Sequence, residues 1–237
     1  MIKNYALGAL IFLAVVSLGS CDRLSGIFNM EGKSDSASAE AADKDTSYAF
    51  GLLLASQFGD LSIRFDYDEV ARGLKDSMEG VNPRISLEEA GMKVQQIFAR
   101  VMEKEASANM EKGNAFLTEN GKKPGISITP SGLQYEVLNE GSGETPGAGD
   151  MVRVNYEGTF IDGVVFDSSY TRGEPVEFPL NQVISGWTEG LQLMRVGSSY
   201  RFFIPSNLAY GEAGREAIPP NSVLIFKIDL LDIIPQE

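Results

Sequence analysis

The spacing of the apolar residues changes once along this chain of 237 residues, close to Gly121. Before that point apolar residues recur every three or four positions, as they do on the buried face of an α-helix. After the turn-forming segment Lys122–Gly125 they alternate with polar residues, as they do in a β-strand with one buried face. The chain is therefore expected to be an α+β protein, with a helical domain at 46–121 and a sheet domain at 122–237.

Three helices are expected in the helical domain. The first starts near Thr46, and small residues recur in it at every fourth position, which lets another backbone come close. The second covers 66–78, and the third starts at the Ser86–Glu89 capping box, runs to about Asn120 and could reach about 50 Å. So long a helix cannot bury its apolar face within one subunit, so we expect a homodimer through 46–120; a helical hairpin packed on the next domain is the alternative. The small residues are Ser47, Gly51, Ala55 and Gly59.

The sheet domain contains four runs of alternating apolar residues, which predict antiparallel strands. Asp162-Gly163 is a hairpin signal between two strands, and only Trp187–Met194 has a helical pattern. We therefore expect a sheet wrapped on one short helix. The alternating residues are Leu133, Tyr135 and Val137; Val152, Val154 and Tyr156; Tyr200, Phe202 and Ile204; and Leu224, Phe226, Ile228 and Leu230.

Composition excludes several kinds of chemistry. The chain has no His, so it cannot contain a Ser-His-Asp triad, a His general base or a His-ligated metal. One Cys rules out an internal disulfide and a site built from several thiolates. The net charge of −13 argues against a nucleic-acid partner. No metal and no cofactor are expected.

The N-terminus has the pattern of an export signal. Lys3 precedes an uncharged, mostly apolar run at 5–19, which is short for a membrane span and typical of a signal peptide. Leu18–Cys21 resembles a bacterial lipobox, in which the thiol is lipidated and the chain is cut before the cysteine. We expect a signal peptide at 1–20, lipidation of Cys21 with palmitate among its acyl chains, a flexible tether at 21–45 and a membrane-anchored lipoprotein on the periplasmic or cell-surface side. The alternative is an ordinary signal peptide with a cysteine there by chance.

Five motifs follow one another in the sheet domain: Val154–Gly158, Phe166–Ser169, Val183–Trp187, Ala209–Gly211 and Ile218–Ser222. By the order and spacing of these motifs, residues 128–237 resemble an FK506-binding-protein (FKBP) type peptidyl-prolyl cis-trans isomerase. The Ser47–Gly51 motif and the long third helix also resemble the amino-terminal domain of the bacterial Mip and FkpA group, in which two subunits exchange helices to form a V-shaped dimer. The resemblance implies an isomerase that acts on proline-containing polypeptides during folding of exported proteins, and it makes macrolides such as FK506 possible ligands.

Rotation about an X-Pro bond suits a chain without histidine. The barrier is about 18 to 20 kcal/mol because rotation breaks amide resonance, and no bond to another atom is made or broken. The catalyst therefore needs an apolar pocket that grips proline and favours the twisted amide, with no nucleophile or titrating base.

The resemblance also assigns roles to individual residues. Trp187 forms the pocket floor, Tyr210 and the Ile184 N–H donate to substrate carbonyls, and Asp167 lies beside the twisting carbonyl with Arg172 orienting it. The catalytic residues are then Tyr156, Asp167, Trp187, Tyr210 and Phe226. The substrate-binding residues are Phe166, Arg172, Val176, Val183, Ile184 and Ile218.

Alternatives remain at this stage. The aromatic residues could be ordinary core, Asp167 could cap a turn, and Ile218-Pro219-Pro220 could be only a rigid loop. Val176 replaces an aromatic residue of some relatives, and 215–217 departs from the apolar, Pro or Gly residues that relatives often have there. A holding chaperone or partner-binding module that uses the dimer cleft is the competing function.

Overall fold

The computed structural model describes residues 41–57, 63–215 and 217–234, which fall into two compact units divided after Phe65. The predicted signal peptide and Cys21 lie outside the described residues. The first unit contains α2 (Lys44–Gln57), which begins slightly earlier than expected. It does so because the Asp43 carboxylate accepts a hydrogen bond from the Thr46 N–H at 2.7 Å and thereby caps the helix.

The other two expected helices are present in the second unit. Asp66 caps α3 (Tyr67–Met78), and Gly80 ends the turn after it with a φ of 64°. The hydroxyl of Ser86 accepts a hydrogen bond from the Glu89 N–H and caps α4 (Leu87–Asn120). Only the serine half of the expected capping box forms, because the Glu89 carboxylate pairs with Lys93 at 3.6 Å instead. Among the described residues, no helix is both long and apolar enough to cross a membrane.

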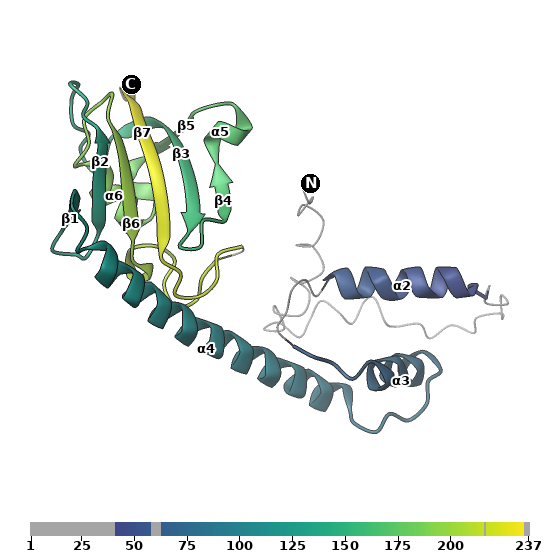
Figure 1. The fold of residues 1–237 in the computed structure, drawn as a ribbon. Coiled ribbons are helices and arrows are strands. Elements are labelled where there is room, and N and C mark those ends of the chain that lie inside the picture. Colours follow the sequence, from purple (N-terminus) through teal and green to yellow (C-terminus); the bar gives the residue numbers. More distant parts are fainter. Residues whose placement is uncertain (1–40, 58–62, 216, 235–237) are drawn as a thin grey trace. The chain divides into compact units, whose positions relative to one another are not determined.

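The rest of the second unit is an antiparallel sheet of seven strands (Figure 1). The strands follow the order β1-β2-β6-β7-β3-β4, and β5 pairs with β3 beside β4. Short helices connect them: α5 (Ser169–Arg172), η1 (Leu180–Gln182), α6 (Ser185–Leu191) and η2 (Ser206–Leu208). The strands are β1 (Ile126–Ile128), β2 (Gln134–Asn139), β3 (Met151–Phe160), β4 (Val165–Ser168), β5 (Val176–Pro179), β6 (Ser199–Ile204) and β7 (Leu224–Ile234).

The core lies between one face of the sheet and α6. The alternating residues of β3, β6 and β7 are buried there as the spacing predicted, together with Trp187 and Leu191 of α6. Glycine lets the helix approach this face, because a Cβ at position 190 would lie 2.7 Å from the ring of Phe202. The antiparallel sheet on a short helix is therefore confirmed. The pattern did not reveal α5, because four residues are too few to show a helical period.

The last turns of α4 cover the opposite face of the sheet. Phe203 alternates with the core residues of β6, yet it is also buried, because Phe116 of α4 packs on it with 6.0 Å between ring centroids. At position 113 glycine is required, since a Cβ there would lie 2.7 Å from Val223. The helix is therefore docked on the sheet over its C-terminal third, which the sequence pattern did not indicate.

Candidate functional site

A cavity of about 410 Å³ opens on the core side of the sheet, and we call it the Trp187 cavity. Strands β3, β4, β5 and β7, helix α6 and the β6–β7 loop all contribute side chains to it. Its volume is that of a small-ligand site. Its lining residues are Tyr156, Phe166, Asp167, Val176, Phe178, Gln182, Val183, Ile184, Trp187, Tyr210, Arg215 and Phe226.

Aromatic side chains hold the indole of Trp187 in place. The rings of Tyr156 and Phe226 meet it edge-to-face, with centroids 5.1 and 5.0 Å away, and the ring of Phe178 lies 5.2 Å away. Edge-to-face packing on two sides favours one orientation of the indole. Its Nε1–H is buried and has no hydrogen-bond partner among the described residues. The aromatic cluster therefore forms a rigid apolar surface.

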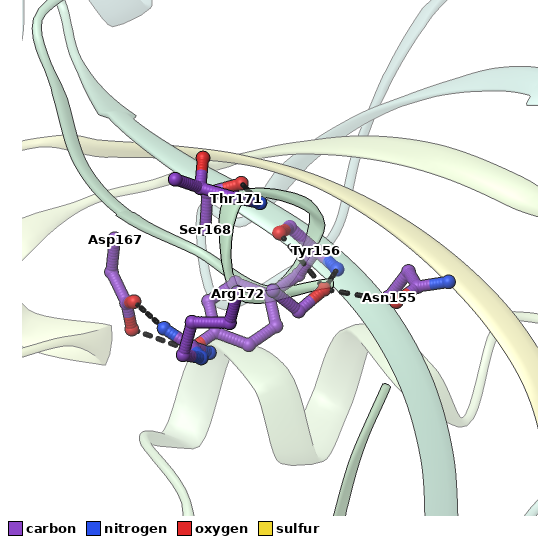
Figure 2. Close-up of polar contacts among 7 residues, drawn as sticks. Asn155, Tyr156, Asp167, Ser168, Thr171 and Arg172 are labelled. Atoms are coloured by element: carbon purple, nitrogen blue, oxygen red, sulfur yellow. Dashed lines mark hydrogen bonds and ion pairs between the residues drawn. The ribbon is translucent and has the colours of Figure 1, made fainter. Parts of the chain in front are cut away.

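One edge of the cavity carries a polar triad of Tyr156, Asp167 and Arg172 (Figure 2). The Tyr156 hydroxyl donates to one carboxylate oxygen of Asp167, and the guanidinium of Arg172 donates to the other. Arg172 also donates to the Tyr156 hydroxyl at 2.9 Å, and its guanidinium lies 5.5 Å from the centre of the Tyr156 ring. Both oxygens of the carboxylate are thus engaged, which fixes its position.

The triad shifts the pKa values of two of its members. Burial raises the pKa of the Tyr156 hydroxyl, and the hydrogen bond to Asp167 raises it further. Hydrogen bonds to Tyr156 and Asp167 raise the pKa of Arg172 above its ordinary value. Tyr156 is therefore a neutral donor and Arg172 a cation throughout the physiological range.

Helix α5 brings Arg172 back over Tyr156. The Ser168 hydroxyl accepts from the Thr171 N–H at 3.4 Å and caps this short helix. The Ser169 hydroxyl accepts from the Tyr156 N–H at 2.9 Å and donates to the side-chain oxygen of Asn155 at 3.0 Å. The helix is thereby attached to β3, and the triad depends on that attachment.

The structure gathers around the Trp187 cavity all the site residues predicted within the sheet domain, except Arg172 and Ile218. Arg172 lies next to the cavity and contacts it through Asp167 and Tyr156. Ile218 packs against the core and pairs with Arg215 through two backbone hydrogen bonds of 2.7 and 2.9 Å. The Ile218 side chain is not part of the cavity lining.

Three lining residues were not predicted: Phe178, Gln182 and Arg215. Phe178 was detectable, because it follows Val176 by two positions and so shares its face of the strand. It supplies an aromatic wall close to the position where Val176 replaces the aromatic residue of some relatives. Gln182 and Arg215 lie in η1 and a loop, where no periodicity indicates the direction of a side chain. Within the described residues, no group of three or more acidic, His or Cys side chains could hold a metal.

Comparison with known families identifies the chain. The model of the FKBP-type peptidyl-prolyl cis-trans isomerase family matches residues 142–231, and the model of the domain amino terminal to it matches 43–137. The FKBP-type isomerase FkpA of Aeromonas hydrophila is 44% identical over 211 residues, which cover 83% of this chain and 78% of that protein. The chain belongs to the FKBP-type peptidyl-prolyl cis-trans isomerase family.

Other relatives of this FKBP-type isomerase are similar to it over most of their length. The outer membrane protein MIP of Legionella longbeachae is 41% identical over 206 residues, which cover 83% of this chain and 88% of that one. The crystal structure of FkpA from Escherichia coli matches with a TM-score of 0.63 and 39% identity, and covers 83% of this chain and 99% of that one. The similarity therefore extends through both the helical and the sheet domains.

Proposed function

We propose that this FKBP-type isomerase accelerates X-Pro rotation by holding the proline ring over Trp187 in the Trp187 cavity. The observation that carries the proposal is the aromatic surface around Trp187, which has one polar edge. The planar amide is more polar than the twisted one, so moving it from water into an apolar cavity raises its energy relative to the twisted form. Each 1.36 kcal/mol gained in this way is worth about tenfold in rate.

Two donors would orient the substrate. The Tyr210 side chain lines the cavity, and its hydroxyl can donate to a substrate carbonyl. The Ile184 N–H precedes the first turn of α6, where backbone donors have no helical partner, and it has none among the described residues. Asp167 would lie beside the twisting carbonyl, held there by Arg172 and Tyr156. These are the roles that the resemblance implies for Asp167, Ile184 and Tyr210.

Isomerase kinetics on short X-Pro peptides test the cavity. We expect Trp187→Leu and Tyr210→Phe in the full chain to lower kcat/KM by about tenfold, since each removes a contact to the twisted amide. Tyr67→Phe is a matched control, because Tyr67 lies on α3 with 81% of its surface exposed. Wild-type rates in both cavity variants would contradict the proposed site.

We also propose that the helical domain forms a homodimer. The apolar side chains of α2 and α3 are exposed within their units, and so are several of those in the first half of α4. Faces of this kind normally lie against another surface. The exposed residues include Leu52 and Leu53 of α2, Val70, Leu74 and Met78 of α3, and Leu87, Met92, Val94 and Met102 of α4.

The same exposed faces support a second function, a holding chaperone for unfolded chains. Apolar helices with several methionines can adapt to varied partners. Suppression of aggregation that survives Trp187→Leu but is lost on removal of 46–120 would support it. Export and lipidation at Cys21 remain proposals that rest on the N-terminal sequence and on a relative named as an outer membrane protein.

A further inference from the structure

Two asparagines join α4 to the loop between β6 and β7, which we call the cavity loop. The Asn109 side-chain amide donates to the Pro220 carbonyl at 2.9 Å. The Asn221 side-chain amide donates in the opposite direction, to the Ala106 carbonyl in α4 at 3.2 Å. We call this reciprocal pair of bonds the asparagine clamp. It lies on the outer side of a loop whose other side borders the Trp187 cavity.

Backbone hydrogen bonds within the cavity loop connect its base, at Asn221, to the residues that line the cavity. The Asn221 N–H donates to the Gly211 carbonyl at 2.9 Å, which closes the base directly beside Tyr210. Farther along the loop, Arg215 and Ile218 exchange the two backbone hydrogen bonds described above. A shift of the base therefore moves Tyr210, whose hydroxyl the proposed mechanism needs.

Asn221 has a backbone conformation that supports this role. Its φ of 54° is the single positive value among the described non-glycine residues, and only 9% of its surface is exposed. Asparagine tolerates this left-handed conformation better than most residues do. The conformation directs the side chain to α4 while the backbone N–H still closes the loop.

The helix does not need the clamp to stay docked. Phe116 packs on Phe203, and Gly113 allows close contact with Val223. At the end of α4, the Asn120 amide donates to Gln134 at 3.0 Å, and the Gln134 amide donates to the Leu117 carbonyl at 2.8 Å. The contacts of Phe116 and Gln134 involve the sheet, whereas Val223 is the last residue of the cavity loop before β7. Loss of the clamp should therefore loosen the loop ahead of Val223 and leave the fold intact.

We propose that Asn109 and Asn221 are positioning residues of the isomerase: they hold the cavity loop against α4 so that the Tyr210 hydroxyl meets the substrate carbonyl. This inference rests on the proposed function of the Trp187 cavity. It makes the last third of α4 a part of the working isomerase domain, in addition to its connection to the helical domain. The two residues act on the substrate only through the loop.

The test uses the full chain with Asn109→Asp and Asn221→Gly. The first variant keeps the side-chain size but removes the donor to Pro220, and the second removes the amide while leaving the left-handed backbone accessible. Asn114→Asp is the matched control, because it adds the same charge to an exposed position of the same helix. We expect KM for an X-Pro peptide to rise about fivefold in both clamp variants, with little change in Tm and none in the control.

A double-mutant cycle distinguishes positioning from general loosening. In a Tyr210→Phe background the hydroxyl is already absent, so Asn109→Asp should lose most of its effect. A full effect in that background, or a clamp variant equal to Asn114→Asp, would overturn the proposal.

Hydrogen exchange tests the clamp without any substrate. Asn109→Asp should speed amide exchange in the cavity loop and leave β6 and β7 unchanged, and unchanged loop exchange would overturn the clamp. If instead the wild-type chain did not accelerate isomerisation, the proposed function would fail while the exchange data would still measure the clamp. Fluorescence of Trp187, the single tryptophan of the chain, reports whether the cavity floor stays intact in each variant.

Discussion

At the scale of single residues, the carboxylate of Asp167 is the best-held polar group of the site. Tyr156 and Arg172 each donate to it, and they also contact each other. A carboxylate with both oxygens engaged is held in one position. It can therefore act as a fixed polar element beside the rotating amide.

This arrangement predicts that catalysis is independent of pH near neutrality. The raised pKa of Tyr156 means that the folded protein favours the neutral phenol. Its stabilising effect is fully present below the unfolded pKa of about 10, and it is lost only as the pH rises through the higher folded value. The chain has no histidine to titrate at lower pH. We expect kcat/KM on a peptide without ionisable groups to be flat from about pH 6 to 9.

A rate profile over this range, with Tm measured at each pH, checks the prediction. A bell-shaped or sigmoidal profile at constant Tm would show that a titrating group takes part in the reaction.

At the scale of elements, α2 and α4 differ in how much of their surface is covered by the rest of their unit. Helix α4 is docked on the sheet through Gly113 and Phe116, while its first half exposes apolar residues such as Met92 and Val94. Helix α2 is exposed on all sides within its own unit. The free surface of α2 makes it the element on which the proposed dimer is best tested.

If the stripe of small residues on α2 forms a dimer contact, larger side chains at these positions should disrupt the dimer. We expect Gly51→Leu and Ala55→Leu to yield monomers, because the larger side chain separates backbones that approach closely. Light scattering of the full chain measures the mass. Ala49→Leu is the control, since it lies on the same helix roughly opposite the stripe. Unchanged mass in both stripe variants would count against this contact.

At the scale of the whole molecule, the isomerase and the helical domains are expected to work at a membrane surface. Attached acyl chains, at about 0.8 kcal/mol per buried methylene, would hold the chain on a bilayer. The predicted tether, which can extend no farther than the start of α2 at Lys44, would then let the folded units reach unfolded clients near that surface. The anchor would thus set where the isomerase acts, while the Trp187 cavity sets what it does.

Removal of the thiol tests the anchor. We expect Cys21→Ala to move the protein from the membrane fraction to the soluble fraction when cells are fractionated, because no acyl chain can attach. Ser17→Ala, a change of similar size within the apolar run, should remain with the membrane. Membrane retention of Cys21→Ala would contradict the lipobox interpretation.

The three helices, four of the strands and most of the cavity lining could be predicted from the sequence and its resemblance to the family. The change of apolar period at Gly121 separated helices from strands, the spaced motifs contain Trp187, Tyr156 and Asp167, and the resemblance added Phe226. Such features are local, because periodicity and turn chemistry act within a few residues. Tertiary structure decided the rest. Phe203 is buried only because α4 covers the outer face of the sheet, which strand alternation alone does not indicate.

The asparagine clamp is another feature that depends on tertiary structure and not on local sequence. Asn109 and Asn221 are separated by more than a hundred positions, and each is an unremarkable polar residue in its own segment. Nothing in either segment indicates the other, because a hydrogen bond between distant segments depends on how helix and sheet dock. The sequence therefore indicated most of the side chains that form the Trp187 cavity, whereas docking of α4 decided what holds its loop in place.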